Sequence, residues 1–188
     1  MPHLHAKEEA VPDPSAAPMI QAVPQLDPVD PSNTSALRRV YGAFPSGLTT
    51  LAALVDGSPV GMVASSFTSV SVDPPLVSVC IQLTSSTWPR LRDRSVIGLS
   101  VLAAGQERQC RSLAGREQHR FDDVDWSADE DGAVYIAGSV AWMECTVHEI
   151  VRAGDHDIVL LRMQAARLNG PAPLVFHGSA FHALAATA

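Results

Sequence analysis

Short apolar runs alternate with turn residues along most of the chain, a pattern typical of many short β-strands. Residues 48–55 form a nearly continuous apolar run, Asp56-Gly57 is a hairpin turn signal, and a second apolar run returns from Pro59. Further strands are predicted at 95–102, 133–137, 139–152, 157–168, 174–178 and 181–184. Many strands at short spacing with few helices favour a mainly β protein of the barrel type.

Three segments have helical spacing instead. In residues 36–44, Leu37, Val40, Tyr41 and Phe44 recur on one face after capping residues at 32–35. A short helix is predicted at 88–93, where Pro89 suits a first turn. Residues 106–114 form the third predicted helix, with Cys110 and Leu113 on one face.

The first 32 residues differ from the rest of the chain. They hold seven of its 14 prolines, and proline fixes φ and removes a hydrogen-bond donor. We therefore expect a disordered, proline-rich tail at 1–32 and one folded domain at 33–188. No signal peptide and no apolar run of membrane-spanning length is present, so a soluble, cytoplasmic protein is expected.

Charge and cysteine content narrow the class of protein further. The formal net charge is −7 and the basic residues are scattered, which argues against nucleic acid as a partner. Cys80, Cys110 and Cys145 are an odd number of cysteines in apolar surroundings, so reduced and mostly buried thiols are expected. His177 and His182 have the spacing of a loose metal pair, but a third ligand is missing, and no metal site is predicted.

Residues 59–87 carry the most unusual pattern, and we expect two strands joined by Asp73-Pro74-Pro75. The first strand is rich in hydroxyl side chains, and the second ends in the hydroxyl-rich turn 84–87. Adjacent hydroxyls and exposed amides in a turn provide neutral donors for an anion, and a helix N-terminus at Trp88-Pro89 would add to them. The alternative is solvent-facing serines and an ordinary polar turn with a helix cap.

Residues 62–77, MVASSFTSVSVDPPLV, resemble the core motif of the flavin reductase family, the NAD(P)H:flavin oxidoreductases that serve two-component monooxygenases. The resemblance covers roughly residues 37–184 and includes Phe44-Pro45-Ser46-Gly47-Leu48-Thr49 before the first barrel strand. It implies a split β-barrel of the FMN-binding, Greek-key-like type with a few short helices. It also implies a homodimer that binds flavin near the subunit interface.

The resemblance assigns a flavin site to residues in three parts of the chain. The resemblance implies residues that lie along the isoalloxazine ring and ribityl chain, and others whose backbone lies beside the ring. It also implies contacts to the phosphate and an Arg-Phe pair in the loop 116–131. They are Met62, Ala64, Ser65, Ser66, Cys80, Ile81, Gln82, Ser85, Ser86, Thr87, Arg120 and Phe121.

Gly154-Asp155-His156 matches a family motif whose histidine lies near the bound nicotinamide nucleotide. Two flanking carboxylates, Asp155 and Asp157, would favour the protonated form of His156; without the family match, a solvated hairpin histidine is the simpler interpretation. Phe181 stands where the family commonly has a tyrosine, so stacking on the nicotinamide is retained and the hydroxyl is lost.

The implied function is an NADH-dependent reductase that transfers hydride to FAD or FMN and supplies free reduced flavin to a partner monooxygenase. No side-chain acid or base is needed, because orientation of the two rings suffices. NADPH is the alternative donor. The competing functions are a flavin-binding carrier module without NADH activity and a flavoenzyme that retains its flavin to reduce another substrate. An alanine-rich chain with more arginine than lysine hints at a natural-product pathway.

Overall fold

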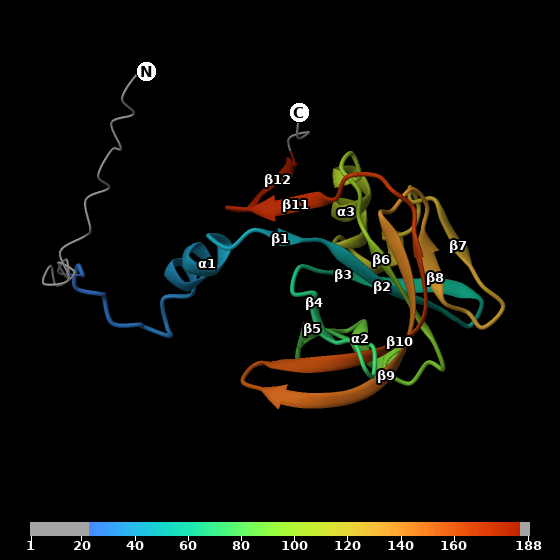
Figure 1. The fold of residues 1–188 in the computed structure, drawn as a ribbon, viewed down its shortest axis with the longest axis horizontal. Helices are drawn as coiled ribbons and strands as arrows, with labels where there is room; N and C mark the ends of the chain where they lie inside the picture. The colour runs from blue at the N-terminus through green and yellow to red at the C-terminus, as the bar shows by residue number, and fades with distance from the viewer. Residues whose placement is uncertain (1–22, 185–188) are drawn as a thin grey trace, which may run out of the picture.

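The computed structural model describes residues 23–184 and shows a mainly β protein built on one curved sheet of seven strands (Figure 1). The order of the strands is β3-β2-β6-β9-β10-β5-β4, and every neighbouring pair is antiparallel. The bounds are β2 Thr49–Val55, β3 Ser58–Ala64, β4 Thr68–Ser71, β5 Leu76–Gln82, β6 Ile97–Val101, β9 Ala141–Ala153 and β10 His156–Leu168.

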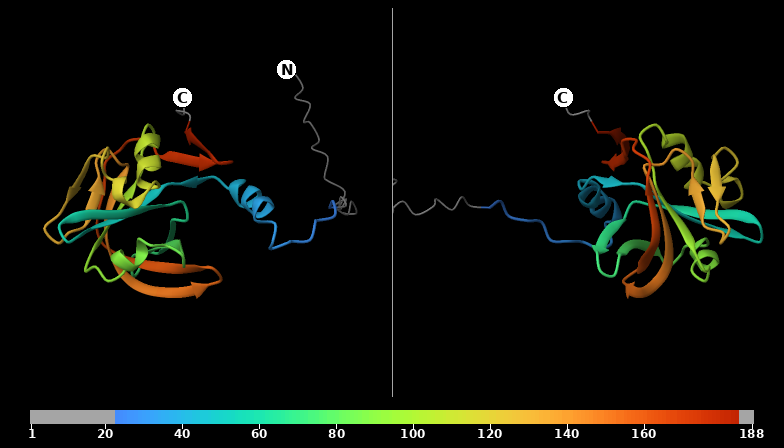
Figure 2. Two further views of the ribbon diagram at one scale, coloured as in Figure 1. Left: turned by 180° about the vertical axis from the view of Figure 1, so that it is seen from behind. Right: turned by 45° about the vertical axis from the view of Figure 1, so that its right-hand side comes forward.

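Two smaller sheets flank this barrel. One consists of β1 (Ser46–Gly47), β11 (Leu174–His177) and β12 (Ala180–Ala183), and the other of β7 (Trp126–Ala128) and β8 (Val134–Ile136). The seven-stranded sheet curls without closing, since β3 and β4 are its two edge strands (Figures 1 and 2). This is the split β-barrel that the family resemblance implies.

The hydroxyl-rich first strand predicted after Pro59 is wrong in one respect. The chain leaves the sheet between Ser65 and Phe67, so β3 and β4 are separate strands at opposite edges. The short connection therefore crosses the opening of the split barrel. Because a side chain on such a crossing is released from strand alternation, Ser65 and Ser66 can both face the opening.

Turns predicted from glycine and acidic residues are present. Asp56 and Gly57, with φ of 51° and 76°, connect β2 to β3 in the left-handed conformation of a two-residue hairpin. Gly154, with φ of 65°, lies in the turn from β9 to β10. This second hairpin is long and reaches beyond the barrel (Figure 1).

Within the described part of the chain, four short helical segments accompany the strands: α1 Thr34–Gly42, α2 Trp88–Leu91, α3 Glu107–Leu113 and the 3₁₀ turn η1 Glu117–His119. Asn33 caps α1, since its side-chain oxygen accepts a hydrogen bond of 3.0 Å from the Ala36 amide. Cys110 and Leu113 of α3 are both buried, as their spacing predicts.

α1 does not bury its apolar face against the barrel. No residue of α1 is buried, and Val40, Tyr41 and the following Phe44 are largely exposed. α1 stands away from the barrel (Figure 2), and its end is tied to the β11–β12 turn by a hydrogen bond from the Gly178 amide to the Gly42 carbonyl.

Two apolar clusters hold the fold together. The larger one fills the barrel with side chains from β2, β3, β5, α2, β6, β9 and β10, and the second lies under α3 and β11. Phe121 packs against the second cluster, and Trp126, which is 38% exposed, meets Phe121 edge to face.

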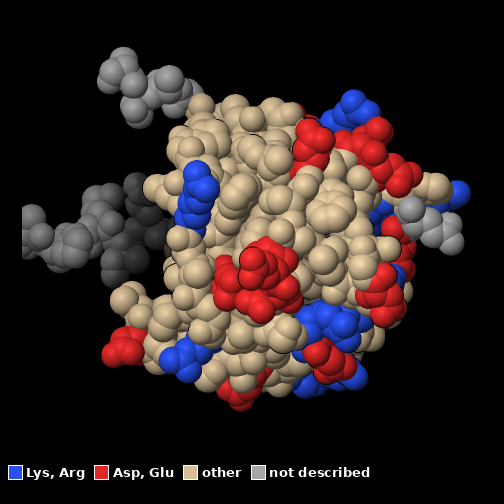
Figure 3. Space-filling model, turned by 90° about the vertical axis from the view of Figure 1, so that its right-hand side faces the viewer, with Lys and Arg blue, Asp and Glu red and all other residues tan. Residues whose placement is uncertain are grey.

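Most of the predicted tail, residues 1–22, lies outside the described residues. Residues 23–30 are described and form neither helix nor strand. Within residues 23–184, no helix combines the length and the apolar character needed to cross a membrane. On the face shown in Figure 3, acidic and basic side chains are interspersed among uncharged ones.

Candidate functional site

A hollow of about 390 Å³ opens where the chain crosses from β3 to β4. Three parts of the chain meet there: the end of β3 with the crossing segment, the end of β5 with the turn after it, and the start of β10. The lining residues are Met62, Val63, Ala64, Ser65, Ser66, Cys80, Ile81, Gln82, Thr84, Ser85 and His156.

Hydrogen bonding fixes the wall formed by Ser66. Its hydroxyl accepts a 2.8 Å hydrogen bond from the Cys80 amide and donates a 3.2 Å hydrogen bond to the Cys80 carbonyl. The crossing segment is thereby attached to β5. Ala64 is buried, while Ser65 remains exposed at the rim of the hollow.

The hairpin register brings His156 to the same hollow. His156 lies opposite Gln82 on β5, and the Leu83 amide donates to the Asp155 carbonyl at 3.0 Å. The His156 Nδ1 lies 2.7 Å from a carboxylate oxygen of Asp155. This contact lowers the pKa of Asp155 below its ordinary value.

The two carboxylates that flank His156 in the sequence make different contacts in the structure. Asp157 lies opposite Arg152 on β9, and the Arg152 Nε donates to its carboxylate at 2.9 Å. Asp157 is therefore paired with Arg152 across the hairpin, while Asp155 holds the ring of His156.

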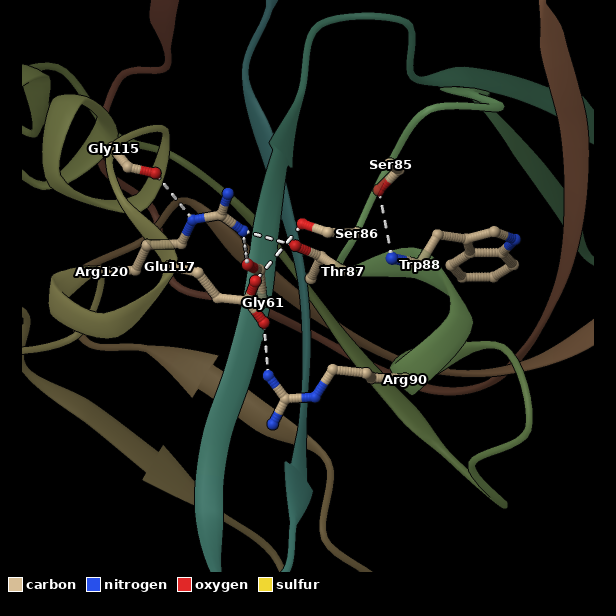
Figure 4. Close-up of polar contacts among 9 residues, drawn as sticks. All are labelled: Gly61, Ser85, Ser86, Thr87, Trp88, Arg90, Gly115, Glu117 and Arg120. Carbon is tan, nitrogen blue, oxygen red and sulfur yellow. Dashed lines mark hydrogen bonds and ion pairs between the residues drawn. The ribbon is translucent and has the colours of Figure 1, made fainter.

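The turn of Ser85, Ser86 and Thr87 directs its three hydroxyls to three different partners (Figure 4). Ser85 Oγ accepts a 3.1 Å hydrogen bond from the amide of Trp88, the first residue of α2. Ser86 is exposed and donates at 3.3 Å to Glu117. Thr87 is 2% exposed, and its hydroxyl accepts from Arg120 at 2.7 Å.

Arg120 connects three segments by hydrogen bonds. Besides Thr87, its guanidinium donates to the Gly61 carbonyl at 2.8 Å and to the Gly115 carbonyl at 3.0 Å (Figure 4). Gly61 also makes room for Phe121, because a Cβ at that position would lie 2.9 Å from the phenyl Cζ. The predicted Arg-Phe pair thus docks its loop onto β3.

A second hollow, of about 630 Å³, lies beside this docked loop. It is lined by β3 residues, by arginines of α2 and of the loop, and by Glu117 and Phe121; the set is Ser58, Pro59, Val60, Gly61, Arg90, Arg116, Glu117, Arg120 and Phe121. Since Ser86 and Thr87 bond to Glu117 and Arg120, the two hollows flank one turn.

Phe181 lies apart from these residues. It packs on Phe176 with ring centroids 5.6 Å apart, and the guanidinium of Arg111 lies 4.7 Å from the centre of its ring. It does not line either of the two hollows. Within one described chain, the two predicted nicotinamide contacts, His156 and Phe181, are therefore separate.

The three thiols are free, as expected, but they are not alike. Cys110 and Cys145 are buried, and burial raises the pKa of Cys110 and raises that of Cys145 to about 12. Cys80 is exposed, contrary to the expectation from its apolar neighbours. On β5 it alternates with buried Val79 and Ile81, so its side chain points to the other face of the strand.

The chemistry of the first hollow suits a flat, polar heterocycle. Hydroxyls, the side chains of Gln82 and His156, and apolar Met62 and Val63 lie around it. A cleft with apolar walls and a few polar groups is typical of small-molecule and cofactor sites. In residues 23–184, no group of three or more metal-ligating side chains is present.

Comparison with known proteins places the chain in a family. Residues 41–185 match the model of the flavin reductase like domain. A curated relative, the NADH-dependent FAD reductase of Streptomyces globisporus, is 41% identical over 169 residues, which span 86% of this chain and 92% of that protein. The chain therefore belongs to the flavin reductase family.

Solved structures agree with this assignment. The Streptomyces globisporus C-1027 NADH:FAD oxidoreductase SgcE6 in complex with NAD and FAD fragments aligns with a TM-score of 0.79 and 40% identity, covering 85% of this chain and 98% of that chain. BorF, the flavin reductase component of a bacterial two-component tryptophan halogenase, aligns with a TM-score of 0.75 and 32% identity, covering 82% and 100%.

Two of the residues that shape this region were not predicted from sequence. Glu117 contacts Ser86 from 31 positions away, and Arg90 contacts Glu117 from 27 positions away. No rule of local sequence spacing predicts contacts between positions this far apart in the chain. Val63 and Thr84 were also missed, although both neighbour predicted residues in the motif and in the turn.

Proposed function

We propose that the protein is an NADH-dependent flavin reductase that binds FAD or FMN as a substrate and releases it reduced. The observation that carries this proposal is the shared hollow: the crossing segment, the end of β5 and His156 line it together. These are the segments in which the family motif and the Gly-Asp-His motif occur. NADPH remains the alternative donor.

In this proposal the hollow holds the isoalloxazine ring and ribityl chain. Met62, Ala64, Ser65 and Ser66 line one side, and Cys80, Ile81 and Gln82 line the other. Ser85, Ser86 and Thr87 belong to the turn assigned to the phosphate, with Arg120 and Phe121 holding that turn and β3 in place. Because Thr87 is buried and bonded to Arg120, it acts through its backbone and packing.

His156 is the group placed to orient the nicotinamide nucleotide. Its contact with Asp155 fixes the ring at the mouth of the hollow. When both substrates are bound, the nicotinamide delivers hydride to the flavin, and the protein contributes stacking and orientation. Phe181 is proposed as a second nicotinamide contact, on the grounds of the family motif alone.

We also propose that the protein is a homodimer. In a single chain α1 has no buried residue, and Val40, Tyr41 and Phe44 are 68%, 69% and 79% exposed. A helix with an apolar face needs a partner surface to cover it. A second copy of the same chain is always present to provide that surface. Sedimentation velocity tests this: wild-type protein should be dimeric and Tyr41→Glu/Phe44→Asp monomeric. A monomeric wild-type protein would contradict it.

The reduced flavin would be used by a separate flavin-dependent monooxygenase, reached by diffusion. Relatives support this role, such as the reductase component of a flavin-dependent trigonelline monooxygenase from Acinetobacter baylyi, which is 34% identical over 146 residues that span 77% of this chain and 47% of that protein. We place the protein in the cytoplasm, where its three free thiols stay reduced. Residues 33–188 would form the catalytic domain and residues 1–32 a tail.

Two variants test the assignment of the site. Ser86→Asp puts a carboxylate in the proposed phosphate turn, so binding of FMN and FAD in a fluorescence titration should weaken sharply. His156→Ala should raise the Michaelis constant for NADH more than it raises the flavin dissociation constant. Unchanged flavin affinity in the first variant, or equal effects of the second on both ligands, would remove the corresponding role.

A further inference from the structure

The carboxylate of Glu117 lies against two groups that could otherwise bind an external anion (Figure 4). One carboxylate oxygen accepts the Ser86 hydroxyl at 3.3 Å, and the other pairs with the guanidinium of Arg90. Arg116 and Arg120 line the second hollow together with Arg90 and Glu117. Glu117 thus places a negative charge among these arginines, next to the proposed phosphate turn.

Ser86 cannot serve Glu117 and a phosphate at once. A serine hydroxyl has a single hydrogen to donate, and in this structure it is directed to Glu117. Guanidinium groups bind carboxylate and phosphate in the same way, through charge-assisted N–H donors. A flavin phosphate that takes the Ser86 hydrogen bond must therefore displace the Glu117 carboxylate, and remaining beside it would be repulsive.

The exposure of this pair makes such an exchange feasible. The side chains of Arg90 and Glu117 are 43% and 35% exposed. Ion pairs this accessible to water contribute little to stability, so a stronger anion can replace one partner without unfolding the loop. Arg120, with its three hydrogen bonds, keeps the loop docked in either arrangement.

We propose that Glu117 is an internal competitor of the flavin phosphate for Ser86 and Arg90, and that it weakens the binding of phosphate-bearing flavins. This inference rests on the proposed function, since it assigns an affinity-setting residue to the same site. The consequence is selective: riboflavin has no phosphate and is unaffected by the competition. A reductase that releases its product benefits, because FMN and FAD leave more readily.

The test compares three flavins on the same protein at constant ionic strength, with dissociation constants from quenching of flavin fluorescence. In Glu117→Gln, FMN and FAD should bind roughly two- to fivefold more tightly, as expected when an exposed charge pair of this strength is removed. Riboflavin should change less than twofold. The ratio of the riboflavin to the FMN dissociation constant isolates the contribution of the phosphate.

Asp123→Asn is the matched control, because it removes one negative charge from the same loop. Asp123 pairs with Arg108, is 64% exposed, and touches neither Ser86 nor Arg90. It should leave all three affinities unchanged. If Glu117→Gln is poorly folded by circular dichroism, Glu117→Ala should give the same selective gain.

The outcomes separate this proposal from the proposed function. Equal changes for riboflavin and FMN, or weaker FMN binding in Glu117→Gln, would overturn the role of Glu117 alone. The same gain in Asp123→Asn would also overturn it, because net charge would then explain the effect. A wild-type protein that binds none of the three flavins would overturn the proposed function and this inference together.

Discussion

Ser66 lies opposite Cys80, where it continues the register in which β4 pairs with β5. Thr68 pairs with Ser78 in that ladder. Two residues before Thr68, the Ser66 hydroxyl hydrogen-bonds both the amide and the carbonyl of Cys80, which lies two residues after Ser78. A side chain thus replaces a strand at the point where the chain leaves the sheet for β3. The wall of the hollow exists because of this substitution.

Ser66→Ala should therefore destabilise the protein by about 1 kcal/mol, since the Cys80 amide and carbonyl lose their partner. Urea unfolding followed by circular dichroism measures the change. Ser69→Ala, an exposed hydroxyl on β4, should have almost no effect. Equal destabilisation by the two variants would contradict the account of the crossing segment.

Arg120→Ala should lower the free energy of unfolding by about 2 kcal/mol, because three acceptors on three segments lose a charged donor. Arg120→Lys should recover less than half, because an ammonium cannot reproduce the planar fork. Arg116→Ala, an exposed arginine of the same loop, is the control for charge. If it matched Arg120→Ala in urea titrations, a general charge effect would replace the bridging role.

Thiol labelling should distinguish the three cysteines. In the native protein an aromatic disulfide reagent should modify Cys80 alone, because Cys110 and Cys145 are buried with raised pKa values. All three should react in denaturant. Added flavin should slow labelling of Cys80, which lines the hollow. An unchanged rate at saturating flavin would place the flavin elsewhere.

The pair of Asp155 and His156 should make stability depend on pH in acid. The folded pKa of Asp155 is lowered, so its contribution is complete above the ordinary value of 3.8 and is lost as the pH falls through the folded pKa. The difference between wild type and Asp155→Asn in urea midpoint should therefore shrink below pH 3.8. A constant difference across pH 3 to 6 would show that the negative charge of Asp155 does not stabilise the fold.

Much of the fold could be predicted from local pattern. Most of the strands, the Asp56-Gly57 hairpin and the short proline-led helix α2 follow from residues close together in sequence, whereas β1 and β7 were not predicted. The break at Ser65 could not be predicted, because residues 59–71 remain compatible with one continuous strand. β3 ends because β4 lies at the opposite edge of the split barrel, so the chain must leave the sheet to reach it.

The candidate site divides in the same way. Residues adjacent in the motif gather in the hollow, and His156 joins them through hairpin register. The partners of the phosphate turn depend on how the loop of Glu117 and Arg120 docks, which linear spacing does not encode. The helical spacing of α1 was predicted from the sequence, but none of its residues is buried in the described chain, which the spacing does not reveal.

Turnover of NADH is the measurement that tests the account most directly. Purified protein is mixed with NADH in air, and absorbance of NADH is followed with riboflavin, FMN or FAD in excess or with no flavin. The account predicts consumption that requires added flavin and continues for many turnovers per protein molecule. Tight flavin binding without loss of NADH would contradict it and leave a flavin-binding module as the function of this fold.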